Sequence, residues 1–258
     1  MKGFLNRLTL TAMNGRGLLW LLLLWVPPAL SAAELHVAVA SNFSGVMKVI
    51  AARFEAQSGH RVILSFGSTG KHYAQIKNGA PFDLFFAADA HRPELLEQAQ
   101  IASPGSRFTY AIGRVVLWSP SADYVDGQGD ILNSGRYRYL AIANPILAPY
   151  GKAAREVLET RGLWADLNRR MVRGENIAQT FQFVSSGNAE LGFVAYSQIR
   201  SSGRTIKGSV WVVPQALYTP IKQQAVLLRE GEAARALMAF VRSDGMRRII
   251  QEHGYDIP

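Results

Sequence analysis

Short apolar runs alternate along the chain with stretches that have helical periodicity. After residue 43, for example, Val46, Ile50 and Phe54 recur every four positions and share one predicted helical face. In the first half, the predicted strands are residues 35–40, 62–66 and 82–87, and the predicted helices are residues 43–57, 70–77 and 93–98. Strands that alternate with helices are typical of parallel βαβ units, so the pattern predicts an α/β fold.

The pattern changes near Tyr110 and then repeats. A long strand is predicted at residues 111–119, followed by a turn-rich polar stretch and a second series of strands and helices. The predicted strands of this series are residues 140–143, 171–172, 191–195, 211–214 and 225–228. The predicted helices run from the end of the 144–151 loop to about residue 160, over residues 164–170, and from the 175–176 cap to about residue 185, with an amphipathic tail helix over residues 232–245.

We therefore expect two α/β lobes with a ligand cleft between them. Lobe 1 would comprise residues 34–110 and 215–258, and lobe 2 would be the inserted residues 111–214. Strands near residues 111–119 and 211–228 would cross between the lobes and form the hinge about which the cleft closes.

The first 33 residues have the composition of a signal peptide. Three basic residues precede or flank an apolar run at residues 18–26, and small residues at 31–33 form a cleavage site. The apolar run is too short to span a bilayer, which needs about 20 residues. We predict export with cleavage near Ala33; a retained membrane anchor is the alternative.

The overall composition is that of a globular protein, with 48% of the 258 residues hydrophobic and 18% charged. The chain has no Cys, which excludes disulfides, thiolate metal sites and a Cys nucleophile. Removal of the signal peptide takes away three positive charges and lowers the formal charge from +9 to +6. The basic residues are dispersed along the chain, so we expect no nucleic-acid partner.

Four times, a predicted strand ends in a small polar loop that leads into a helix. These loops are residues 40–43, 66–70, 144–151 and 174–177. Free backbone N–H groups at a helix N-terminus bind anions well, and the first two loops follow strands and so share one sheet edge. We expect the four loops to hold one oxyanion. The alternative for any single loop is a plain helix cap, since Ser, Thr and Asn are common N-caps; Ser41 or Asn42 would cap the first helix.

Enzymatic alternatives find less support in the residue pattern. The stretch from Gly67 to Lys71 lacks the first Gly and the final Ser or Thr of a phosphate-binding P-loop, and Ser68 lacks the flanking pattern of a nucleophile elbow. The five His residues are scattered without metal-ligand spacing. A metal-assisted phosphoesterase that uses Asp83 and Asp89 remains as a rival, but we predict a binding protein with no catalytic residue.

Seven stretches of the chain carry a resemblance to a known family: residues 40–43, 65–71, 75–89, 105–113, 144–145, 148–151 and 191–195. On these stretches, the chain after the signal peptide resembles the periplasmic molybdate-binding proteins of ABC transporters along essentially its whole length. The Gly-Ala-Pro-Phe-Asp-Leu-Phe-Phe-Ala-Ala-Asp run at 79–89 is specific to this family and its close relatives. The resemblance implies a two-lobe periplasmic-binding-protein type II fold. It also implies a monomer that captures molybdate, usually also tungstate, and delivers it to a membrane permease.

The resemblance also implies a set of oxyanion donors. By position they are Ser41 and Asn42 from the first loop, Ser68 or Thr69 from the second, Tyr150 from the third and the Ile177 backbone N–H from the fourth. A Tyr that some members place after the Gly-Phe-Val strand falls here on Ala195, one residue before Tyr196, which favours Tyr150 as the hydroxyl donor. No cofactor is implied, and molybdenum would be present only within the oxyanion, without a direct protein ligand. Sulfate or phosphate is the alternative ligand.

Overall fold

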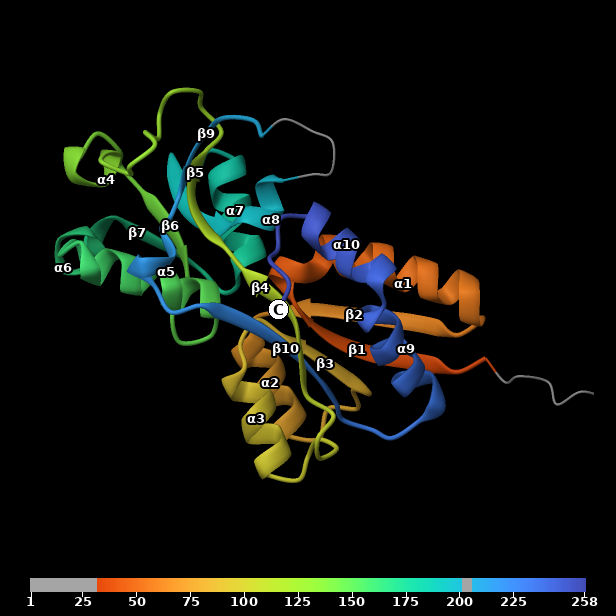
Figure 1. Cartoon of the computed structure of the whole chain (residues 1–258). Coiled ribbons are helices and arrows are strands. Elements are labelled where there is room, and N and C mark those ends of the chain that lie inside the picture. Colours follow the sequence, from red (N-terminus) through yellow and green to blue (C-terminus); the bar gives the residue numbers. More distant parts are fainter. Residues whose placement is uncertain (1–31, 201–205) are drawn as a thin grey trace, which may run out of the picture. The chain divides into compact units, whose positions relative to one another are not determined.

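The computed structural model describes residues 32–200 and 206–258, which form one compact unit built on two five-stranded sheets (Figure 1). Most of the predicted signal peptide lies outside the described residues. The first sheet has the order β2-β1-β3-β10-β4, with β1 Glu34–Ala40, β2 Arg61–Gly67, β3 Leu84–Ala87, β4 Phe108–Gly113 and β10 Ile221–Leu227. The second has the order β7-β6-β8-β5-β9, with β5 Val115–Ser119, β6 Leu140–Ala143, β7 Met171–Gly174, β8 Leu191–Ala195 and β9 Ser209–Val212.

Each sheet has parallel strands on one side and antiparallel strands on the other. In the first sheet β1 pairs in parallel with β2 and β3, whereas β10 runs antiparallel to β3 and β4. In the second, β6 pairs in parallel with β7 and β8, whereas β5 runs antiparallel to β8 and β9. The predicted βαβ units are present, and the antiparallel strands are those that carry the chain between the sheets.

Helices cover both faces of the first sheet (Figure 1). Strand β3 illustrates why, because successive side chains point to opposite faces: Phe86 packs into the cluster with α1 (Ser44–Ser58), α9 (Glu232–Arg242) and α10 (Asp244–Glu252). Its neighbour Phe85 packs into a separate cluster with α2 (Thr69–Lys77) and α3 (His91–Gln98). Both rings are fully buried, so the strand is apolar on both faces, as its sequence predicts.

The second sheet is covered in the same way. Residues of α5 (Pro149–Thr160) pack with β6 and β8 in one cluster, and residues of α7 (Ile177–Ser185) pack on the opposite face. The shorter helical elements are α4 Ile131–Ser134, α6 Trp164–Leu167, α8 Tyr196–Ile199, η1 Ser41–Phe43, η2 Asn168–Arg170 and η3 Gln215–Leu217. Among the described residues, no helix is long and apolar enough to cross a membrane.

The chain changes sheets at two places, and there the structure differs from the predicted elements. The single strand predicted at 111–119 is two strands, because the backbone leaves the first sheet after β4 and enters the second at β5, with Arg114 between them. It returns between β9 and β10 through residues 213–220. The prediction of one strand was wrong because both halves are apolar and hydropathy does not register a change of pairing partner. The lobe boundaries and the hinge motion stay predictions.

The tail predicted as one helix over 232–245 is two helices, α9 and α10. The backbone becomes extended at Ser243, with φ −64° and ψ 151°, and the Ser243 hydroxyl donates to the Phe240 carbonyl over 2.7 Å. Both helices bury apolar residues in the same cluster, including Leu237 and Ile250. The prediction of one helix was wrong because the amphipathic pattern continues through the break at Ser243.

Candidate functional site

The four polar loops meet at one small cavity of about 10 Å³, which residues from both sheets line. Strand register explains the meeting. Ala40 and Gly67 are partners at the ends of β1 and β2, and Ala143 and Gly174 are partners at the ends of β6 and β7. Each pair of loops therefore leaves its sheet side by side. The structure brings together all six predicted donor residues: Ser41, Asn42, Ser68, Thr69, Tyr150 and Ile177 line the cavity with Ala40, Gly67, Ala88, Ala148 and Pro149.

The first loop forms a 3-10 turn, η1, and here one expectation was wrong. Neither Ser41 nor Asn42 caps a helix through its side chain. The Ser41 hydroxyl oxygen instead accepts from the Ala178 N–H in α7, the helix that packs on the second sheet, over 3.4 Å. The Asn42 amide donates to Gln223 Oε1 over 2.7 Å and to the Tyr255 hydroxyl over 3.1 Å. The Asn42 amide nitrogen is thus occupied by a buried network, because long-range partners compete successfully with a local cap.

The second loop supplies two hydroxyl groups whose oxygens already accept hydrogen bonds. Ser68 caps α2, its oxygen accepting from the Lys71 N–H over 3.4 Å, and the Thr69 oxygen accepts from the Ala88 N–H over 3.0 Å. Both side chains are at most 3% exposed. An oxygen that accepts retains its own proton for donation. Both hydroxyls can therefore donate into the cavity, and the geometry does not separate Ser68 from Thr69.

The third loop places Tyr150 at the start of α5 with 1% of its surface exposed. Its hydroxyl oxygen accepts from Gln223 Nε2 over 3.4 Å, which leaves the hydroxyl proton for an acceptor in the cavity. Burial raises the pKa of Tyr150 well above 10, with nearby Tyr255 adding to the effect, so the phenol stays neutral and protonated. Tyr196 does not line the cavity; its hydroxyl accepts from the Arg200 guanidinium over 3.2 Å.

The fourth loop caps α7 through Asn176. Asn176 Oδ1 accepts from the N–H groups of Ala178 and Gln179 over 3.0 and 3.1 Å. This cap does not take the N–H of Ile177, the first helical residue, which is 3% exposed and lines the cavity. A helix N-terminus carries a partial positive charge, so this N–H is a suitable anion donor.

The cavity has no charged side chain among its lining residues. The two carboxylates of the phosphoesterase alternative are held elsewhere. Asp83 accepts from the His36 N–H over 2.7 Å and pairs with Arg229. Asp89 accepts from the Arg92 N–H in the first turn of α3 and pairs with the Arg92 guanidinium. Within the described residues, no group of three or more His, Asp or Glu side chains is placed to hold a metal ion. The site offers neutral hydrogen-bond donors.

Behind the cavity lies a buried polar network that the sequence pattern does not predict. Gln223 is fully buried, and its oxygen accepts from Asn42 and from the Tyr110 hydroxyl while its amide nitrogen donates to Tyr150. Gln223 lies at an irregularity in β10, where the pairing with β4 shifts register. Gln223 lies within the stretch 211–228 that was predicted to cross between the lobes, but outside the strand predicted at residues 225–228. A polar residue two positions before an apolar run was the available signal, because a buried Gln needs partners.

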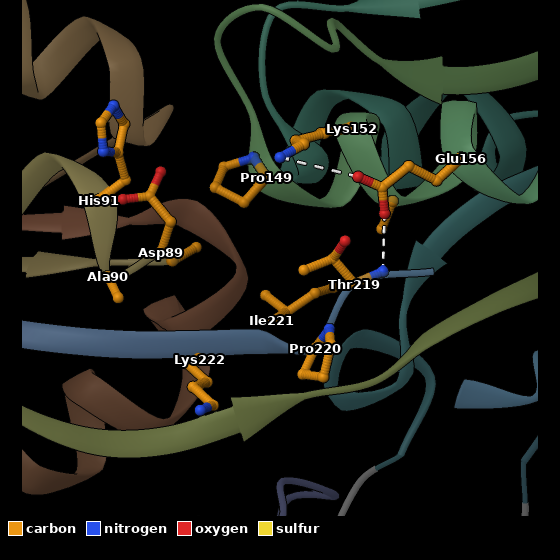
Figure 2. A pocket seen from close by; sticks show the side chains of 12 residues that line it. Asp89, Ala90, His91, Pro149, Lys152, Glu156, Thr219, Pro220, Ile221 and Lys222 are labelled. Atoms are coloured by element: carbon orange, nitrogen blue, oxygen red, sulfur yellow. Dashed lines mark hydrogen bonds and ion pairs between the residues drawn. The ribbon is translucent and has the colours of Figure 1, made fainter. Parts of the chain in front are cut away.

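A larger groove of about 380 Å³ adjoins the cavity and shares Ala88 and Pro149 with it. Figure 2 shows Asp89 and His91 on one side of this groove and Lys152 and Glu156 on the other, with residues 219–222 along its floor. Glu156 accepts from the Thr219 N–H over 2.7 Å. The groove carries charges of both signs on a largely apolar wall, whereas no charged side chain lines the cavity.

Two mixed sheets with four loops converging on a neutral cavity define a solute-binding protein of the α/β periplasmic type. A profile of the bacterial extracellular solute-binding protein family matches residues 35–256, and the chain belongs to this family. The chain is 50% identical over 232 residues to the molybdate-binding protein ModA of Azotobacter vinelandii, which covers 89% of this chain and 92% of the relative. It is 44% identical over 228 residues to ModA of Rhodobacter capsulatus, covering 87% and 89% of the two chains.

The solved structure of the Azotobacter vinelandii periplasmic molybdate-binding protein superimposes with a TM-score of 0.85 at 43% identity. The match covers 87% of this chain and 99% of that one. The predicted fold class, an α/β periplasmic-binding-protein fold, is thereby confirmed.

Proposed function

We propose that this protein is the substrate-binding component of an ABC importer that captures molybdate, and also tungstate, and delivers it to a membrane permease. The observation that carries the proposal is the single uncharged cavity in which hydroxyl and backbone N–H donors of four loops meet. Family membership and the names of two relatives, 50% and 44% identical to this chain, support the choice of ligand. The protein would act in the periplasm as a monomer, with binding and release as its activity.

The chemistry of the cavity suits a tetrahedral dianion. Such an ion presents four acceptor oxygens and no donor, so a cavity of donors satisfies it. The donors would be the hydroxyls of Ser41, Ser68, Thr69 and Tyr150 with the backbone N–H groups of Asn42 and Ile177. A hydrogen bond to a charged group contributes about 1.5–3 kcal/mol. Six of these, reduced by desolvation and ordering costs, correspond to micromolar to nanomolar affinity, roughly −8 to −12 kcal/mol.

The same donor set disfavours a protonated anion. Hydrogen phosphate carries a proton that needs an acceptor, and no carboxylate lines the cavity. The oxygens of Ser68, Thr69 and Tyr150 already accept from protein groups. Sulfate has no such proton and is the stronger rival, to be separated from molybdate by its smaller size.

Calorimetric titration of the chain without residues 1–33 tests the proposal, with molybdate, tungstate, sulfate and phosphate as ligands. We expect tight binding of molybdate and tungstate, much weaker binding of sulfate, and none of phosphate. Equal binding of all four ions, or binding of none, would overturn the assignment. Turnover of a chromogenic phosphate ester with Mg²⁺ would instead favour the phosphoesterase, whose two carboxylates are already paired with Arg229 and Arg92.

A further inference from the structure

Two short hydrogen bonds join the sheets beside the cavity without lining it. Arg92 Nη2 donates to the Ile146 carbonyl over 2.8 Å, and the Gly70 N–H donates to the Leu147 carbonyl over 2.8 Å. The donors lie in α3 and α2, the helices that pack on the first sheet. The carbonyls lie in the loop that connects β6 of the second sheet to α5. Both bonds therefore hold the loop just ahead of Tyr150.

Asp89 fixes Arg92 in position for this contact. One Asp89 oxygen accepts from the Arg92 backbone N–H over 3.0 Å, and the other pairs with the guanidinium. The two side chains are only 21% and 19% exposed. A Cβ built on Gly70 would lie 3.0 Å from the Leu147 oxygen and 3.2 Å from Arg92 Nη2. The Arg92 guanidinium, the start of α2 and the loop before α5 are therefore in close contact. An anchored guanidinium loses little conformational freedom when it binds a carbonyl.

The contact lies at the rim of the apolar packing between the sheets, where Ala88 joins the buried cluster that contains Ala148 and Tyr150. The 380 Å³ groove begins directly beside the contact, and Asp89 itself lines it. In Figure 2, Asp89 and His91 face Pro149 and Lys152 across open space. At this rim, directed hydrogen bonds connect the start of α3 and of α2 to the loop before α5.

We propose that Arg92, anchored by Asp89, is a latch that holds the two sheets together over the bound anion and sets the rate of its release. The proposal rests on the proposed function of oxyanion capture. Arg92 is not among the residues that line the cavity, so it is a positioning residue. Release requires the sheets to separate and this bond to break, whereas capture by the open protein does not. Loss of the latch should therefore raise the dissociation rate and leave the association rate unchanged.

The chain offers a matched control in the Lys71–Glu175 ion pair, which joins α2 to the loop between β7 and α7 across the cleft. Lys71 Nζ lies 3.2 Å from Glu175 Oε1, but these side chains are 52% and 53% exposed. Exposed ion pairs contribute little, about 0–1 kcal/mol. Lys71→Gln removes the same charge as Arg92→Gln, so the pair of variants separates the latch from a general loss of positive charge.

The experiment follows release of radiolabelled molybdate into excess unlabelled molybdate by rapid filtration, together with association in stopped flow and melting of the anion-free protein. Arg92→Gln should speed release about tenfold, the loss of one hydrogen bond to a charged group, with unchanged association. Asp89→Asn should also speed release although it changes the net charge in the opposite direction, and Lys71→Gln should stay within about twofold. Arg92→Lys, which keeps the charge without the planar fork, should lie between wild type and Arg92→Gln.

Three outcomes would overturn the latch: wild-type release from Arg92→Gln, equal acceleration in Lys71→Gln, or opposite effects of Arg92→Gln and Asp89→Asn. A lowered melting temperature of the anion-free variants with wild-type release would show a purely structural role. If Arg92→Gln does not fold, Arg92→Lys and Asp89→Asn still decide between these results. Failure of the wild-type protein to bind any tetrahedral oxyanion would instead overturn the proposed function.

Discussion

Replacing Tyr150 by Phe removes one hydroxyl group from the cavity while keeping the aromatic ring that packs in the core. The Tyr150 oxygen accepts from Gln223, so its hydroxyl proton can donate to an anion in the cavity. The substitution removes this hydrogen-bond donor. Loss of a hydrogen bond to a charged ligand costs about 1.5–3 kcal/mol, which corresponds to a roughly 10- to 150-fold higher Kd for molybdate. Calorimetry at neutral pH measures this directly.

Tyr196→Phe is the matched control for this substitution. Tyr196 lies outside the cavity lining and bonds Arg200, so its variant should bind molybdate with the wild-type Kd. Since burial raises the pKa of Tyr150 well above 10, the effect of Tyr150→Phe should also be constant with pH up to about 10. Unchanged affinity in Tyr150→Phe would refute the assignment of its hydroxyl as a donor, and a large loss in Tyr196→Phe would refute the geometry.

Two further substitutions test the groups behind the cavity. Gln223→Leu leaves Asn42 and Tyr150 each short of one partner, so we expect a loss of about 1–3 kcal/mol in unfolding free energy together with weaker molybdate binding; wild-type values in urea titration and calorimetry would contradict the network. His72 lies 4% exposed beneath the second loop, and burial lowers its pKa below 6.5, so its neutral form adds stability above pH 6.5 that is lost as pH falls through the lowered pKa. His72→Gln should therefore lose less unfolding free energy than wild type between about pH 7 and pH 5, and an unchanged pH dependence would refute this.

Local pattern was sufficient for much of the fold. Most strand and helix positions followed from hydrophobic periodicity, because burial on one or two faces imposes that period on the residues themselves. Capping by residues such as Asn176 and Ser68 also follows from local sequence, since a cap bonds N–H groups two or three residues away. Errors occurred where the chain changes partners without changing composition, as at Arg114, or where one amphipathic pattern continues through a break, as at Ser243.

The sequence by itself determined which loops carry donors, how the strands and helices alternate, and the resemblance that implied the six candidate residues. Only the tertiary structure decided where each polar group is directed. The Asn42 amide bonds Gln223, which is 181 positions away, and not a local cap. Arg92 reaches a carbonyl 54 positions away, and Tyr196 lies outside the cavity. The physical reason is that a cap depends on near neighbours in sequence, whereas a buried polar group takes whatever partner the packed sheets bring within hydrogen-bond distance.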